Sequence, residues 1–155
     1  PGPAGEPVVG YRVELGGRSV VISGAAAGSR ALRATAAGAE LLVHEAQAAH
    51  LVEARADARA AEGRPRAAQL LGYALGGRAP PAQAVALARE IGARQLVLTH
   101  LSPPLSDPAS VRAFLRGSVQ GWSGEVRIGE DGLHFAMPAQ VQALQVDRLE
   151  EVEEP

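Results

Sequence analysis

The chain opens with a two-residue alternation of apolar and charged positions. Within residues 8–15 this alternation places Tyr11, Val13 and Leu15 on one face of a predicted strand and charged side chains on the other. A Gly-Gly pair separates it from a second strand-like run, residues 18–22. Two such runs joined by two glycines predict a β-hairpin.

The rest of the chain switches between helical and strand patterns. Helices are predicted where a capping residue or a proline begins the pattern and a glycine ends it. The predicted helices cover residues 29–37, 45–62, a segment beginning at Pro65, 81–91 and 107–116. Buried strands are predicted at 41–44 and 96–100, and a terminal hairpin at 126–128 with 134–137. This order predicts a mixed α/β fold in which helices cover at least one face of a sheet.

The length predicts a single domain. A chain of 155 residues that is 46% hydrophobic can bury one core. We expect the domain to cover residues 1–138, followed by an acidic tail at 139–155. We interpret the end of this tail, DRLEEVEEP, as a solvated or frayed helix. The sequence begins at Pro1 and its only methionine is Met137, so one hypothesis is that it is a piece of a longer reading frame.

Composition excludes several kinds of function. The chain has no cysteine, which excludes thiol nucleophiles, disulfides and cysteine-bound metals, so any metal needs histidines and carboxylates. The 15 basic residues are scattered and the formal net charge is −2, so nucleic acid binding is not indicated. No apolar run approaches the roughly 18 residues that cross a bilayer. We therefore expect a cytoplasmic protein without membrane contact.

Four segments, in order along the chain, carry a likeness to a known family: YRVELGGRSVVISG, AGAELLVHEA, AVALAREIGARQLVLTHLSPP and GEVRIGEDGLHF. Together they resemble the carboxyl-terminal half of metallo-β-lactamase-fold hydrolases, in the branch that contains ribonuclease Z and the arylsulfatase-like hydrolases. The resemblance covers residues 8–137. It implies an αββα sandwich, of which this chain is one half, and a dinuclear zinc site that activates water to cleave phosphodiester or sulfate-ester bonds.

Part of that zinc site is missing from the sequence. Two zinc ions about 3.5–4 Å apart need an anionic oxygen ligand between them. The resemblance places this bridging aspartate in a Ser-Gly-Asp motif at a strand end, where the sequence reads Ser23-Gly24-Ala25. Ala25 thus occupies the bridging position. The H-x-H-x-D-H ligand cluster of the amino-terminal half does not occur in this sequence.

Other positions carry expectations from the same resemblance. His100, in the segment LTHL, matches the final metal ligand and is the residual ligand of this half. His44 and Glu45 match a V-H-E-A segment that supports the site from behind the ligands. Arg78 aligns with the family's catalytic histidine. An arginine can stabilise an oxyanion there, but it cannot donate a proton at neutral pH.

The histidines also have structural interpretations. An isolated histidine does not hold zinc without partners, so His100 and His44 are also interpreted as hydrogen-bonded strand residues. His50 and Glu53 have an i, i+3 spacing that is compatible with metal binding, but no second such pair accompanies them. His134 is interpreted as a structural residue of the terminal hairpin.

Three functional hypotheses follow. The chain is a degenerate relative of these hydrolases, inactive by itself, without stoichiometric zinc and retained as an interaction module. Alternatively, it is the carboxyl-terminal half of an active zinc hydrolase, completed by a partner with H-x-H-x-D-H. Ala25 and Arg78 favour the first hypothesis, because truncation alone does not explain two losses inside the surviving half. A third hypothesis, an unrelated α/β binding domain, needs the four matches to be accidental.

A lone half of a sandwich also leaves one face of its sheet uncovered. Soluble monomers rarely expose an apolar face of several hundred Å². We therefore expect a homodimer, a complementary amino-terminal half or another partner chain, or the helix at 45–62 folded over the face. The residues expected on this face, depending on the register, are Val20, Ile22, Leu42, Leu96 or Leu98.

Overall fold

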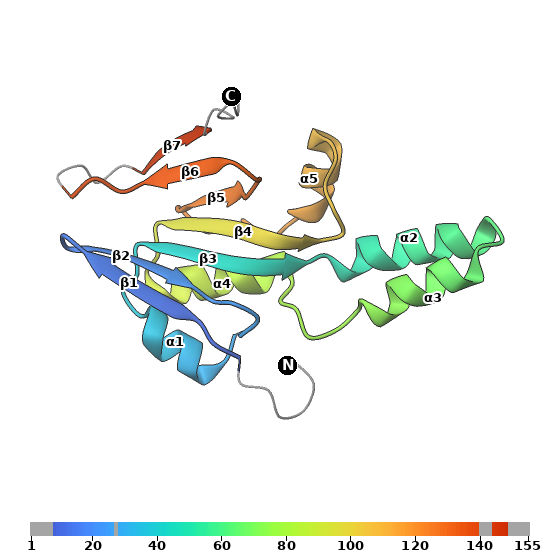
Figure 1. Cartoon of the computed structure of the whole chain (residues 1–155), viewed down its shortest axis with the longest axis horizontal. Helices are drawn as coiled ribbons and strands as arrows, with labels where there is room; N and C mark the ends of the chain where they lie inside the picture. The colour runs from blue at the N-terminus through green and yellow to red at the C-terminus, as the bar shows by residue number, and fades with distance from the viewer. Residues whose placement is uncertain (1–7, 27, 140–143, 149–155) are drawn as a thin grey trace, which may run out of the picture.

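The computed structural model describes residues 8–26, 28–139 and 144–148, and its centre is a five-stranded sheet (Figure 1). Its strands are β1 (Tyr11–Leu15), β2 (Arg18–Ile22), β3 (Leu41–Gln47), β4 (Gln95–Ser102) and β5 (Glu125–Ile128), in the order β1-β2-β3-β4-β5. β1 and β2 form the predicted antiparallel hairpin, and β2 to β5 run parallel. The carboxyl ends of β2, β3 and β4 therefore meet at one edge.

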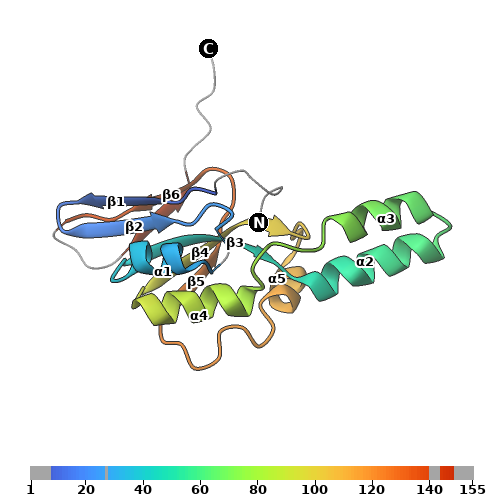
Figure 2. The same cartoon turned by 90° about the horizontal axis from the view of Figure 1, so that it is seen from below.

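Two helices cover one face of this sheet. α1 (Arg30–Ala36) and α4 (Pro81–Ile91) lie on the same side of the strands (Figure 2). Their ends follow the predicted signals, since Ser29 accepts a hydrogen bond from the Leu32 N–H and Gly92 ends α4 in the left-handed conformation. The core between helices and sheet includes Val21, Leu42, Leu96, Leu98, Leu32, Ala36, Leu87 and Ile91. The prediction of a mixed α/β fold with a helix-covered sheet is confirmed.

A helical hairpin extends from the carboxyl end of β3. It consists of α2 (Ala49–Ala61) and α3 (Pro65–Tyr73), and both views show it projecting beyond the sheet (Figures 1 and 2). The predicted start of this first helix at Glu45 is wrong. Glu45 pairs with Thr99 and Gln47 with Ser102, so the β-ladder continues past His44. No helix of the described segments is long and apolar enough to span a bilayer.

The carboxyl-terminal strands pair differently from the prediction. α5 (Pro108–Phe114) precedes β5, which pairs with β4, whereas β6 (Leu133–Ala136) pairs with β7 (Gln145–Arg148) in a separate antiparallel sheet. The predicted hairpin of 126–128 with 134–137 is therefore wrong. The strand β7 includes the first two residues of the segment DRLEEVEEP, for which the sequence pattern indicates a helix, because they pair with β6. Residues 140–143 and 149–155 of the tail lie outside the described part.

The second face of the five-stranded sheet carries an exposed apolar stripe. Tyr11 lies opposite Ile22 and Val13 opposite Val20, so these side chains and Leu15 share the face without helices. Tyr11 is 62% exposed, Val13 54% and Leu15 83%. We call these five residues the apolar stripe. Three residues also expected on an uncovered face lie instead in the helix-covered core, because the register places them there: Leu42, Leu96 and Leu98.

Candidate functional site

Three residues from distant parts of the sequence meet at the carboxyl edge of the sheet. The Arg78 Nη2 atom lies 3.1 Å from His100 Nε2, and His100 Nδ1 lies 3.4 Å from Glu45 Oε2. The Arg78 Nε atom is 3.7 Å from the same carboxylate oxygen. Glu45 is buried, Arg78 is half-buried and the His100 side chain is 65% exposed. We call these three residues the strand-end cluster.

The backbone at His100 is unusual. Its φ of +46° lies in the left-handed region, and no other non-glycine residue of the described segments has a positive φ. For a residue with a Cβ atom this conformation costs roughly 1–2 kcal/mol. Backbone strain of this kind is concentrated at functional sites. This strained residue is a member of the cluster and contacts both Arg78 and Glu45.

Gln47 holds the loop that carries Arg78. Its buried side chain donates a hydrogen bond to the Ala74 carbonyl at 2.7 Å and accepts one from the Gly76 N–H at 3.3 Å. The Gln47 N–H also donates to the Ala79 carbonyl at 2.9 Å. Gln47 is not among the residues expected at the site, because the alanine-rich pattern predicts a helix over it. A polar side chain inside an apolar strand pattern is the signal that could have found it.

His44 does not join the strand-end cluster. It is buried on the helix-covered face, since side chains alternate along β3 and its neighbour Leu42 lies in that core. Its Nδ1 atom is 2.6 Å from the Glu45 carbonyl, and its Nε2 atom has no partner among the described residues. The structure thus separates the two adjacent residues that the resemblance treats as a pair.

The loop after β2 brings no ligand to the same edge. Ala25 is exposed in the turn that follows Gly24. Gly24 has a φ of +54°, and a Cβ atom there would lie 2.3 Å from the Val9 carbonyl oxygen, so the turn requires glycine. At the next residue, the methyl side chain of Ala25 occupies the position at which the resemblance implies a bridging carboxylate.

The residues present do not fit a zinc site. Zinc in proteins takes three or four nitrogen, sulfur or oxygen ligands. Within residues 8–26, 28–139 and 144–148, no group of three or more His, Cys, Asp or Glu could hold a metal. His50 and Glu53 are exposed on α2, and His134 is exposed on β6. Of the strand-end cluster, only Glu45 and His100 are potential ligands, and a guanidinium contacts both.

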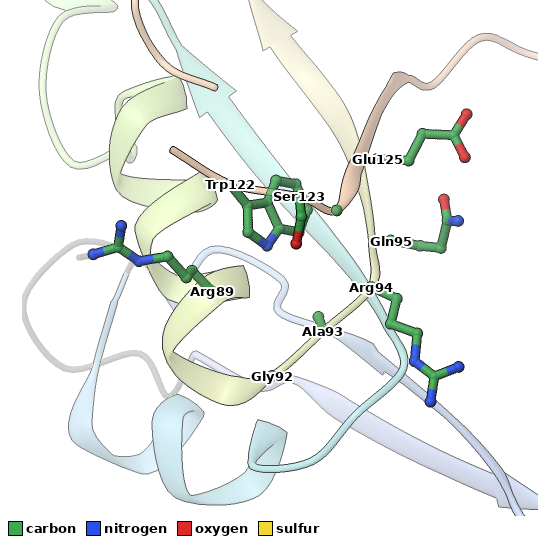
Figure 3. A pocket seen from close by; sticks show the side chains of 9 residues that line it. Arg89, Gly92, Ala93, Arg94, Gln95, Trp122, Ser123 and Glu125 are labelled. Carbon is green, nitrogen blue, oxygen red and sulfur yellow. The ribbon is translucent and has the colours of Figure 1, made fainter. Parts of the chain in front are cut away.

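Two hollows lie at opposite ends of β4. One, of about 680 Å³, begins at Leu101 beside His100 and is lined by α5 and the end of β5. The other, of about 650 Å³, surrounds Trp122 at the amino end of β4. Figure 3 shows this indole beside the last turn of α4, from which Arg89 extends. The first hollow begins one residue beyond His100 along β4, and its lining contains none of the three residues of the strand-end cluster.

Comparisons with known proteins support the fold. No protein-family model and no curated protein matches the chain. Among solved structures it is similar to the metallo-β-lactamase fold protein YhfI from Bacillus subtilis, with 22% identity and a TM-score of 0.50. The similarity covers 78% of this chain and 41% of the other, so the chain spans less than half the length of that protein. The architecture is thus that of part of a metallo-β-lactamase fold.

Proposed function

We propose that the chain is a degenerate relative of metallo-β-lactamase-fold hydrolases, of ribonuclease Z or arylsulfatase-like ancestry, and that it is inactive by itself. The observation that carries this proposal is the contact of the Arg78 guanidinium with His100 Nε2. A metal ion bound through this nitrogen would have to displace the guanidinium. Ala25, at the position of the bridging carboxylate, supports the same conclusion.

A repair experiment tests this proposal. We expect the chain to hydrolyse no bis-p-nitrophenyl phosphate with added zinc, and we expect the same of the double variant Ala25→Asp/Arg78→His. The repaired chain still has too few ligands, because two added side chains and His100 do not supply two complete zinc sites. Zinc-dependent turnover by either chain alone would contradict the proposal.

The alternative function is that of an active half-enzyme completed by a partner chain. The hollow of about 680 Å³ at the carboxyl end of β4 favours it, because it leaves space for a substrate at the edge of the sheet on which His100 lies. Coexpression with an amino-terminal half carrying H-x-H-x-D-H tests this alternative. A purified complex that contains zinc and cleaves bis-p-nitrophenyl phosphate would support it against the first proposal.

The proposal also includes a cover for the apolar stripe. Isologous pairing is the commonest closed assembly of soluble proteins, so we propose a homodimer in which a second copy packs on the stripe. Leu15 at 83% exposure and Tyr11 at 62% are the observations that support this contact. A complementary amino-terminal half is the other occupant, and it would give a heterodimer in the coexpression experiment.

A further inference from the structure

The contact between Arg78 and His100 determines which imidazole nitrogen carries the hydrogen. A guanidinium only donates hydrogen bonds. Its 3.1 Å contact with His100 Nε2 therefore requires a lone pair on that nitrogen. In a neutral ring the hydrogen then lies on Nδ1, which faces Glu45 Oε2 at 3.4 Å. The imidazole thus accepts from Arg78 and carries its own hydrogen on the nitrogen that is nearer to the carboxylate.

The same atoms are those that a divalent cation would use. An imidazole lone pair and a carboxylate oxygen are typical ligands of zinc and related ions. Here the guanidinium contacts the lone pair of His100 and lies 3.7 Å from the Glu45 carboxylate. Because an arginine keeps its positive charge at all physiological pH values, it also repels a second cation at this point.

We propose that Arg78 takes the place of a metal ion in the strand-end cluster and excludes divalent cations from Glu45 and His100. This inference rests on the proposed function and extends it, because it gives the cluster a resident cation supplied by the chain itself. Arg78, which stands at the position of the family's catalytic histidine, then also replaces the metal ion as the positive charge of the cluster.

The state of Glu45 supports this role. Its carboxylate is buried, and its Oε1 atom has no hydrogen-bond partner among the described residues. A buried carboxylate without a neighbouring positive charge is strongly disfavoured. Removing the guanidinium therefore leaves a carboxylate oxygen and an imidazole nitrogen that together favour the uptake of another cation.

Cobalt(II) is a suitable probe, because its visible absorption reports its coordination. We expect Arg78→His, which removes the guanidinium and adds an imidazole, to bind Co²⁺ at least about tenfold more tightly than the unmodified chain. Arg78→Lys keeps the positive charge and should show no gain. The gain should disappear when Arg78→His is combined with His100→Asn, a substitution chosen because asparagine tolerates the left-handed conformation.

The inference is overturned if a folded Arg78→His variant gains no Co²⁺ binding, or if its gain persists with His100→Asn. A measurement on the unmodified chain does not depend on variants: long-range ¹H–¹⁵N NMR spectra should show the hydrogen of His100 on Nδ1. A hydrogen on Nε2 would overturn the inference even if no variant folds. Turnover by the unmodified chain contradicts the proposed function instead, whereas the variant comparison and the NMR spectra test Arg78 alone.

Discussion

At the scale of single residues, the strand-end cluster combines one favourable and one costly feature. Contacts among three polar side chains are offset by the left-handed backbone of His100. Sequence resemblance identified all three members, since each lies at a position of a family motif. Their mutual contact could not be predicted, because Arg78 lies in a loop whose path depends on hydrogen bonds from Gln47.

The strain at His100 gives a prediction for two truncations that remove the same side chain. His100→Gly should be more stable than His100→Ala by about 1 kcal/mol, because only the alanine has a Cβ atom that opposes a positive φ. Urea denaturation of the two variants measures the difference. Equal stability, or a more stable alanine variant, would show that the backbone at this position is not left-handed.

At the scale of elements, periodicity and capping signals identified the first hairpin and the start and stop of α4. They failed where tertiary pairing decided the outcome. β3 continues to Gln47 because β4 pairs with Glu45 and, after a shift in register, with Gln47, although the alanine-rich sequence there favours a helix. The pairing of β6 with β7 likewise depends on a contact between segments that local pattern does not reveal.

The position of the Arg78 loop depends on Gln47, which gives a second prediction. Gln47→Leu should lower the free energy of unfolding by about 1–3 kcal/mol, because it leaves the Ala74 carbonyl without its donor. Gln69→Leu is the matched control, since that glutamine is exposed and its side chain donates to the hydroxyl of Tyr73 rather than to a backbone carbonyl. Thermal or urea unfolding that gives equal losses for both variants would contradict the assignment of Gln47 as the residue that holds the loop.

At the scale of the whole molecule, the unequal covering of the two sheet faces is the main feature. Helices cover one face, and the apolar stripe lies on the other. The expectation of an uncovered face came from the resemblance, but its residues could be assigned only from the strand register. That register places Val20 and Ile22 on the stripe and Leu42, Leu96 and Leu98 in the core.

The proposed homodimer predicts a specific response to charge. Sedimentation equilibrium at micromolar concentration should show a dimer, and Val13→Lys should convert it to a monomer because a charge would be buried at the centre of the contact. Leu70→Lys is the control, since Leu70 is 68% exposed on α3, outside the stripe. An unmodified chain that sediments as a 16.0 kDa monomer and binds no hydrophobic dye would contradict the dimer.

The central claim is that this half of a metallo-β-lactamase fold has lost its metal site, and the zinc content of the purified chain tests it most directly. The chain should be loaded with zinc, passed through gel filtration and examined by elemental analysis. We predict far less than one zinc per chain, because the described part of the chain offers Glu45 and His100 no third ligand and both contact Arg78. One or more zinc ions per chain, removable only by a chelator, would contradict the claim.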